Sequence, residues 1–221
     1  MAAHWRRNVC SPRGMWWNSK SSPSGFCGRS SYRKYAKAGP DKRKVDVMLS
    51  PGADFFQSCW VVQDLHLAMR KWHETTGIGP FFFLENQRPD DYRYCGVAAA
   101  APLFGVAFAY TGKTQIELIV QHDDAPSAYT KTFGRHGAGH HHLGADVTDY
   151  DRRLEAYRAL GLEVTQEATF GGQRYCYVDT REALGFMTEL FEWNSDSKAF
   201  MADVARIAAS WDGQDPYRSM N

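Results

Sequence analysis

The sequence predicts an α+β domain in which two βαβββ modules form one curved mixed sheet around a cleft, behind a disordered N-terminal tail. Three observations lead to this fold class. The 221 residues are 43% hydrophobic and 14% aromatic, which is enough to bury a core. A helix-start pattern recurs 85 residues further along the chain, and strand and turn signals follow both copies in the same order.

The first 47 residues differ in charge from the rest of the chain. They carry eleven Lys or Arg and two Asp, a net charge of +9, whereas residues 48–221 carry fifteen basic and twenty-three acidic residues, a net charge of −8. The segment is rich in Ser, Gly and Pro and has no apolar period, so it cannot bury enough apolar surface to offset its ordering entropy. We therefore expect a disordered tail over residues 1–47 and a folded domain over residues 48–221.

Three roles fit this tail: an arm that binds nucleic acid or an anionic surface, an organelle transit peptide, or no role at all, with Met48 as the biological start. The last is favoured. Tryptophans lie among the arginines of the tail, but no RNA-binding motif accompanies them, so we expect no nucleic-acid partner.

Membrane insertion and a disulfide framework are both unexpected. The longest apolar stretch, Cys95 to Tyr110, contains Pro102 and falls short of the roughly 18 to 20 residues that a membrane-spanning helix needs. The five cysteines are odd in number and form no CxxC pair, which argues against a thiolate zinc site as well. A reducing, cytoplasmic location is the expectation.

Each copy of the repeat begins with a strand, followed by a helix that an Asp can cap and a Gly can end. The strands are expected at residues 55–62 and 139–147. The matching residues are Val62, Asp64, Trp72 and Gly77 in the first copy and Val147, Asp149, Tyr157 and Gly161 in the second.

Three further strands are expected after each helix. They cover residues 81–85, 106–110 and 115–121 in the first copy and residues 163–169, 174–179 and 186–192 in the second, which gives modules of about 54–122 and 137–193. A C-terminal helix over residues 197–211 carries an apolar stripe of Phe200, Val204, Ile207 and Trp211. This stripe requires a partner, either this domain or a second subunit in a homodimer.

Polar residues inside apolar strands indicate a site. Strand alternation predicts that His140 and His142 share one face and that His141 lies on the other. Gln57 lies 85 residues before His142, on the matching strand of the first module. Glu117 and Glu189, 72 residues apart, each interrupt the apolar last strand of a module. A carboxylate there is costly unless it is paired or bound to a metal.

Together Gln57, Glu117, His142 and Glu189 offer three oxygens and one nitrogen. This donor set suits one divalent ion, Mn²⁺, Ni²⁺, Co²⁺, Zn²⁺ or Mg²⁺, in octahedral geometry with two positions left open. Open positions would let a substrate carbonyl or its enolate bind, while a carboxylate that detaches acts as a base on the adjacent C–H.

These residues resemble the vicinal oxygen chelate superfamily, which includes glyoxalases, bleomycin-resistance proteins and extradiol dioxygenases. The resemblance covers Phe55 to about Trp193 and is strongest in the stretches 61–65, 111–119, 139–143 and 185–190. It implies paired βαβββ modules with a metal ion in the cleft. Carried over by position, it places the first-strand ligand on Gln57, the fourth-strand ligand on Glu117, the second His of the His-His pair on His142 and the last-strand ligand on Glu189.

The nearest branch is the one that contains methylmalonyl-CoA epimerases, and the sequence departs from it twice. Gln57 stands where epimerases usually have His, although some glyoxalase I enzymes have Gln there. A Gln at this position also argues against an extradiol dioxygenase, which needs two His and one Glu as ligands. Epimerases use a second carboxylate on the third strand of the first module, but residues 103–108 contain no acid. Glu85 could replace it, although no spacing argument supports this, so a one-base proton shuttle fits better.

The expected function is a metal-dependent lyase or isomerase that abstracts a proton next to a carbonyl group and holds the enolate on the ion. Glu189 is the expected base, and Glu117 is the carboxylate that protonates the opposite face. The substrate is a small molecule with an apolar or aromatic part, if Phe81–Phe83 and Phe104 form cavity walls instead of core. The alternatives are a non-catalytic small-molecule binding protein of the same fold and, less favoured, a ring-cleaving dioxygenase.

Overall fold

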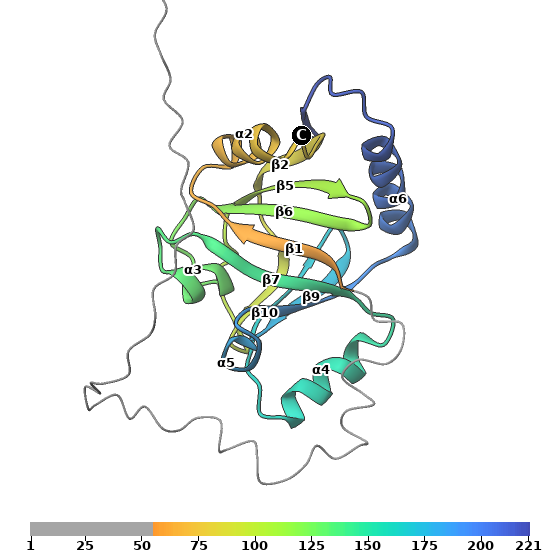
Figure 1. Cartoon of the computed structure of the whole chain (residues 1–221). Helices are drawn as coiled ribbons and strands as arrows, with labels where there is room; N and C mark the ends of the chain where they lie inside the picture. The colour runs from red at the N-terminus through yellow and green to blue at the C-terminus, as the bar shows by residue number, and fades with distance from the viewer. Residues whose placement is uncertain (1–54) are drawn as a thin grey trace, which may run out of the picture. The chain divides into compact units, whose positions relative to one another are not determined.

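One mixed sheet organises the part of the chain that the computed structural model describes, residues 55–221 (Figure 1). The predicted tail of residues 1–47 lies outside the described residues. Within them the sheet has eleven strands in the order β11-β2-β5-β6-β1-β7-β10-β9-β8-β3-β4.

The eight central strands form the two predicted modules. The first lies in the order β2-β5-β6-β1 and the second in the mirrored order β8-β9-β10-β7. β1 runs parallel to β6, β7 runs parallel to β10, and β1 and β7 join the modules as an antiparallel pair. The first module comprises β1 (Phe55–Val61), α2 (Leu65–Thr76), β2 (Phe81–Gln87), β5 (Phe104–Thr111) and β6 (Thr114–Gln121). The second comprises β7 (Gly139–Asp146), α4 (Tyr150–Ala159), β8 (Val164–Phe170), β9 (Gln173–Val178) and β10 (Met187–Glu192). The predicted fold class is therefore confirmed.

Five elements that the sequence did not predict lie at the ends of the sheet or in its connections. They are β3 (Asp90–Tyr94), β4 (Val97–Ala98), α3 (Ala128–Phe133), α5 (Arg181–Leu184) and β11 (Tyr217–Ser219). β3 follows β2 in the chain yet pairs with β8 at the far end of the sheet. Two residues connect β2 to β3, and they span at most about 11 Å. The ends of the sheet therefore lie close together, and the rings of Phe104 in β5 and Phe170 in β8 meet with centroids 5.5 Å apart.

The two predicted helix caps have different outcomes. Asp64 accepts a hydrogen bond from the Leu67 backbone N–H at 2.8 Å, as expected for the start of α2. Asp149 makes no capping bond, so this prediction is wrong. Its carboxylate instead pairs with the guanidinium of Arg153, which is only 5% exposed and requires a counter-charge. Gly77 and Gly161 both have positive φ after their helices, as predicted.

The helices pack against the sheet through separate apolar clusters. α2 buries Leu65 and Met69 against the strands of the first module, and α4 buries Leu154 and Tyr157 against those of the second. α6 (Ser195–Ala209) places Val204, 2% exposed, against Phe82 and Phe108. Val204 and Ile207 of the predicted apolar stripe therefore find their partner within the same domain, whereas Phe200 is 47% exposed and Trp211 lies beyond the end of the helix.

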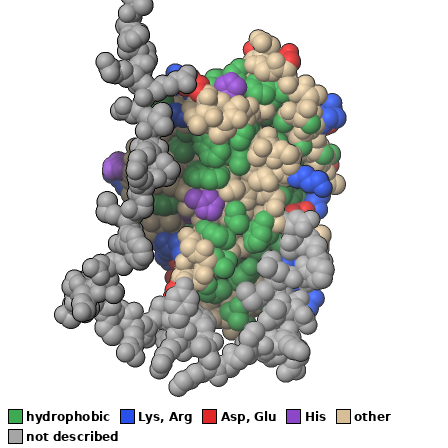
Figure 2. Space-filling model, in the orientation of Figure 1, with side chains coloured by type: hydrophobic (Ala, Val, Ile, Leu, Met, Phe, Trp, Pro, Cys, Tyr) green, Lys and Arg blue, Asp and Glu red, His purple; other side chains and the backbone are tan. Residues whose placement is uncertain are grey.

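The surface view shows apolar and neutral polar side chains over much of the visible face, with charged side chains toward its margins (Figure 2). No helix among residues 55–221 combines the length and apolarity required to cross a membrane.

Replacing Asp64 by Ala should lower the free energy of unfolding by about 1 kcal/mol, because the Leu67 N–H in the first turn of α2 loses its side-chain acceptor. Asp64→Asn is the matched control, since its amide oxygen can accept the same bond. Urea denaturation measures both variants; equal losses in the two would contradict the capping role.

Candidate metal centre

The four predicted ligands come from the four adjacent strands at the centre of the sheet. Gln57 lies on β1, Glu117 on β6, His142 on β7 and Glu189 on β10. In the strand register Glu117 and His142 both lie opposite Cys59, while Gln57 and Glu189 both lie opposite Gly144. The ligands therefore occupy two neighbouring levels of the same concave face.

The other three side chains converge on one atom of the fourth, Nε2 of His142. The Oε1 atom of Gln57 lies 3.0 Å from it, Oε2 of Glu189 3.3 Å and Oε2 of Glu117 3.5 Å. Neighbouring ligands of an octahedral ion with bonds of about 2.1 Å are about 3 Å apart. The separations in this structure thus suit ligands of one ion after shifts of a few tenths of an ångström.

The predicted alternation of the three histidines is wrong, because β7 contains a β-bulge. Cys59 pairs with His142 but Trp60 pairs with His140, so His141 is an extra residue in the ladder. His141 and His142 are both fully buried, and their Nδ1 atoms lie 2.9 Å apart. His140 is on the opposite face, where its Nε2 lies 3.0 Å from the Ser58 hydroxyl. The bulge therefore adds a second imidazole behind the first.

The hydrogen bonds around His142 determine which of its nitrogens carries a proton. Gln57 donates its amide N–H to Oε1 of Gln115 at 2.7 Å, so its own Oε1 accepts from Nε2–H of His142. Nδ1 of His142 then accepts from His141. Binding of an ion at Nε2 requires the opposite tautomer, with Nδ1–H donating to His141, the kind of supporting bond that metal-bound histidines usually make. Burial lowers the pKa of His141 well below its usual value, and the nearby His142 adds to this effect, so His141 stays neutral and can act in either direction.

The two carboxylates are buried beside each other. Burial raises the pKa of Glu117 to about 7, although His142 opposes the rise. The carboxylate of Glu189 is 4% exposed, and its Oε2 atom has no hydrogen-bond donor within the described chain. An unpaired oxygen of this kind is costly unless a cation or a ligand satisfies it. The residues present therefore fit a divalent cation.

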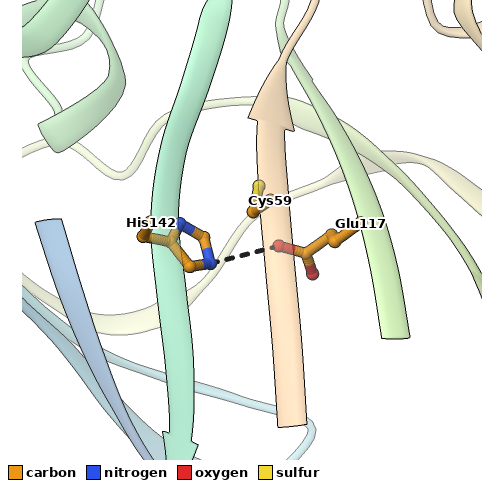
Figure 3. A group of neighbouring side chains, drawn as sticks. All are labelled: Cys59, Glu117 and His142. Carbon is orange, nitrogen blue, oxygen red and sulfur yellow. Dashed lines mark ion pairs between the residues drawn. The ribbon is translucent and has the colours of Figure 1, made fainter. Parts of the chain in front are cut away.

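Cys59 is a neighbour that the sequence reading did not single out. Its sulfur, a carboxylate oxygen of Glu117 and a ring nitrogen of His142 all lie within 4.8 Å of one another (Figure 3). Burial, and then the charge of Glu117, raises the pKa of the Cys59 thiol well above its usual value, so the thiol donates a hydrogen bond to that carboxylate. Its position two residues after Gln57, on the same face of the strand, was the signal available in the sequence.

Gly144 is the counterpart of Cys59 in the second module, 85 residues later and two residues after His142. A Cβ atom at Gly144 would lie 2.8 Å from Oε1 of Gln57 and 3.0 Å from Oε2 of Glu189. The side-chain oxygens of Gln57 and Glu189 therefore occupy the space that a side chain at position 144 would fill. Both modules thus place a small residue next to the centre.

A cavity of about 210 Å³ opens beside the centre on the concave face. Gln57, Glu117 and Glu189 line it together with mainly apolar and aromatic side chains. The apolar and aromatic members of its wall are Leu84, Phe104, Val106, Phe108, Ile119, Tyr129, Phe170, Tyr175, Tyr177, Phe191, Trp193, Phe200, Met201 and Met220. The predicted wall residue Phe104 is confirmed. Phe81–Phe83 are not in the wall, because Phe81 packs under α2, Phe82 packs against α6, and Phe83 contacts His66.

No second acid from the first module reaches the cavity. β5 contributes Phe104, Val106 and Phe108, all apolar. Glu85 lies on the helix side of the sheet, where its carboxylate is 2.9 Å from Nε2 of His66 in α2. Glu85 thus cannot replace the missing acid.

Comparisons with known proteins show the family of the chain. The sequence pattern of the Glyoxalase/Bleomycin resistance protein/Dioxygenase superfamily matches residues 56–177. The chain belongs to this superfamily. No curated protein matches the sequence.

Similar solved structures include methylmalonyl-CoA epimerases of low sequence identity. The enzyme from Mycobacterium tuberculosis is 19% identical, with 65% of this chain and 89% of that one covered and a TM-score of 0.45. A Streptomyces coelicolor epimerase in complex with 2-nitronate-propionyl-CoA is 17% identical, with 65% and 96% covered and a TM-score of 0.43. A hypothetical protein from Bacillus halodurans is 16% identical, with 66% and 97% covered and a TM-score of 0.47.

The metal-free protein should lose stability as the pH rises from 4.5 to about 7. In this range folded Glu117, with its pKa near 7, keeps a proton that the unfolded chain, with a pKa near 4.5, has released. The unfolded state therefore binds fewer protons, so the free energy of unfolding falls with pH, by up to about 3 kcal/mol. Urea denaturation with a chelator present measures this, and Glu117→Gln should remove that part of the slope. Identical slopes would contradict the assignment.

Gly144→Ala should weaken binding of Mn²⁺ by about 10- to 100-fold, the scale seen when groups that orient metal ligands are disturbed. The added methyl group must displace Gln57 or Glu189. Calorimetric titration of the purified chain gives the affinity. Cys59→Ala, at the equivalent position of the first module, adds no atoms and should change the affinity much less; an equal loss in both variants would contradict the space argument.

Proposed function

We propose that this protein is a divalent-metal-dependent isomerase or lyase that removes a proton next to a carbonyl group of a small molecule. The observation that carries the proposal is the convergence of Gln57, Glu117 and Glu189 on Nε2 of His142, beside an apolar cavity.

The proposed ligands are Gln57, Glu117, His142 and Glu189, and the ion is Mn²⁺, Ni²⁺, Co²⁺, Zn²⁺ or Mg²⁺. When bound, such an ion supplies a Lewis acid that stabilises negative charge on a substrate oxygen. The chain supplies the positioning: the Gln115 side chain fixes the Gln57 amide, and His141 fixes the ring of His142.

Glu189 is the proposed base. Its Oε2 atom is buried, has no hydrogen-bond donor within the described chain and belongs to a residue that lines the cavity. Such an oxygen, when it is not bound to the ion, can accept a proton from a bound substrate without first breaking a hydrogen bond. Glu117, with its pKa raised to about 7, is the proposed group that returns a proton to the opposite face.

The absence of an acid on the described inner face of β5 supports proton transfer by Glu189 and Glu117 of the centre, without the further carboxylate that an epimerase carries on that strand. Glu85 faces His66 on the outside of the sheet, and the inner positions of β5 are apolar. The proposed reaction therefore resembles that of a glyoxalase-type isomerase or lyase.

The proposed substrate has a compact apolar or aromatic part, which matches a cavity of about 210 Å³ with aromatic walls. Because similar structures are named as enzymes of methylmalonyl-CoA, CoA thioesters are candidates. A homodimer and a cytoplasmic location stay predictions from the sequence.

One observation favours a second candidate, a small-molecule binding protein without catalysis. Gln115 bonds to Gln57, and Gln57 bonds to His142, so hydrogen bonds between protein groups hold these side chains in place without a metal ion. Elemental analysis of the purified chain separates the two: a stoichiometric divalent ion supports the enzyme, and its absence, with ligand binding unaffected by chelator, supports the binding protein.

Glu189→Gln should keep the fold and bind the ion but lower turnover about 10²-fold or more, the scale of lost general-base catalysis. The measurement is solvent deuterium incorporation into a set of substrates with an acidic C–H: methylmalonyl-CoA, the glutathione hemithioacetal of methylglyoxal, and phenylpyruvate. Glu85→Gln is the matched control, because this carboxylate lies outside the cavity. Normal deuterium exchange in Glu189→Gln, or an equal loss of exchange in the control, would refute the role of Glu189 as the base.

A further inference from the structure

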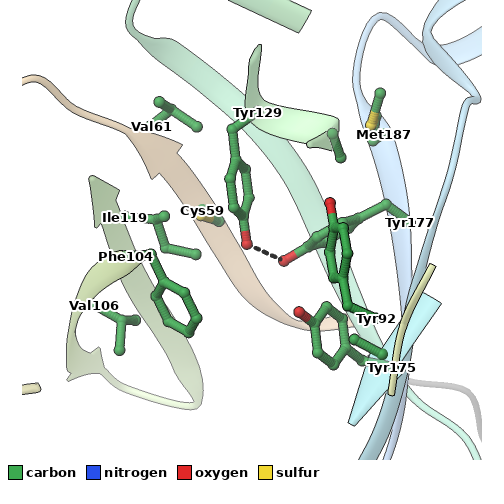
Figure 4. Packing of buried hydrophobic residues seen from close by; sticks show 12 residues of the cluster. Cys59, Val61, Tyr92, Phe104, Val106, Ile119, Tyr129, Tyr175, Tyr177 and Met187 are labelled. Carbon is green, nitrogen blue, oxygen red and sulfur yellow. Dashed lines mark hydrogen bonds between the residues drawn. The ribbon is translucent and has the colours of Figure 1, made fainter. Parts of the chain in front are cut away.

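Two buried tyrosines from different elements meet in the cavity wall next to the metal centre. Tyr129 comes from α3 and is 4% exposed, and Tyr177 comes from β9 and is 2% exposed. Their hydroxyl oxygens lie 3.1 Å apart and form a hydrogen bond (Figure 4). The mechanism proposed above does not use them.

A count of hydrogen atoms shows that this pair has one O–H to spare. Each phenol carries one hydroxyl hydrogen, and the bond between the two oxygens uses one of them. The described residues offer no other acceptor to either hydroxyl. A buried O–H without an acceptor costs free energy, and both residues line the cavity, so the spare hydrogen is available to a bound molecule.

The position of Tyr177 indicates which hydroxyl faces the ligand. Tyr177 is the direct partner of Glu189 in the β9–β10 ladder, and its ring centroid lies 4.8 Å from that of His142. Tyr129 contacts His141, with centroids 5.1 Å apart, as Tyr177 also does at 5.3 Å, but no ring contact joins Tyr129 to His142 among the described residues. Tyr177 is therefore nearer the centre, and either hydroxyl of the pair can be the donor of the bond between them.

Other buried tyrosines near the cavity are placed differently. The Tyr92 hydroxyl is committed to the backbone oxygen of Pro126 at 2.7 Å. Tyr175 accepts from the Gln166 amide at 3.1 Å and pairs with Phe191 in the ladder, not with Glu189. The hydroxyl hydrogen of Tyr175 is thus free as well, and Tyr177 stands out by its position beside Glu189 and His142.

We propose that Tyr177, with Tyr129 donating to it, donates a hydrogen bond to the substrate oxygen that gains negative charge during the reaction. The inference rests on the proposed function. The C–H bond breaks, its proton passes to Glu189, and its electron pair moves through the carbonyl group onto that oxygen. The Tyr177 proton stays on the phenol and stabilises the new charge. The site thus selects molecules that present a carbonyl oxygen to Tyr177 and an apolar part to the cavity wall.

The test is the affinity of acetohydroxamate, a small anionic oxygen ligand, for the full chain loaded with Co²⁺, followed by the visible spectrum of the ion. Tyr177→Phe keeps the ring and removes the donor, so the hydroxamate should bind about 10- to 100-fold more weakly, the value of a hydrogen bond to a charged group. Tyr129→Phe should weaken binding about 2- to 5-fold, because Tyr177 keeps its hydrogen but loses a polarising partner. Tyr92→Phe is the matched control, with no change expected.

Unchanged hydroxamate affinity in Tyr177→Phe, with Co²⁺ affinity equal to that of the parent chain, overturns the inference and leaves the proposed function standing. A parent chain that binds no Co²⁺ defeats the proposed function and this inference with it. If Tyr177→Phe does not fold, Tyr129→Phe decides: weaker hydroxamate binding supports the pair, and unchanged binding overturns it.

Discussion

The antiparallel pairing of β1 and β7 is the constraint on which the centre depends. It joins the first strands of two modules and brings Gln57 and His142, 85 residues apart in the chain, to a contact of 3.0 Å. The parallel partners of these strands, β6 and β10, then place one carboxylate on each side. A slip of one residue in this register would turn the proposed ligands toward the helices, because neighbouring strand residues face opposite ways.

The centre places polar groups where apolar ones would stabilise the fold better. Two carboxylates and two imidazoles lie in the interior, and desolvating them costs free energy that only specific partners offset. Part of the offset is a chain of amide contacts, since Gln115 holds Gln57 and donates in turn to the Tyr110 hydroxyl at 3.0 Å. The Gln115 amide also reaches the sulfur of Met201 in α6 at 3.5 Å, which links the C-terminal helix to the centre.

Repetition made the paired modules, the first strands and the convergence of the four proposed ligands predictable, since it relates residues that are far apart in the chain. The repeat did not predict where a side chain takes a different hydrogen-bond or ion-pair partner, or which distant strands pair. The bulge at His141 arises from one extra residue in a ladder whose partner is distant. Asp149 looked like a cap, but its carboxylate pairs with buried Arg153. The β3–β4 hairpin pairs with β8 of the second module, and the sequence of a short polar strand does not indicate which strand it will pair with.

The two ends of the sheet bear on how the chain behaves in a crowded solution. β11 has three residues and β4 has two, so the outermost strands of the described sheet are too short to template a long run of backbone hydrogen bonds with a neighbouring molecule. The longer, more apolar strands β2 and β8 lie one and two places inward. Short outer strands thus shield a β-rich fold from edge-to-edge aggregation.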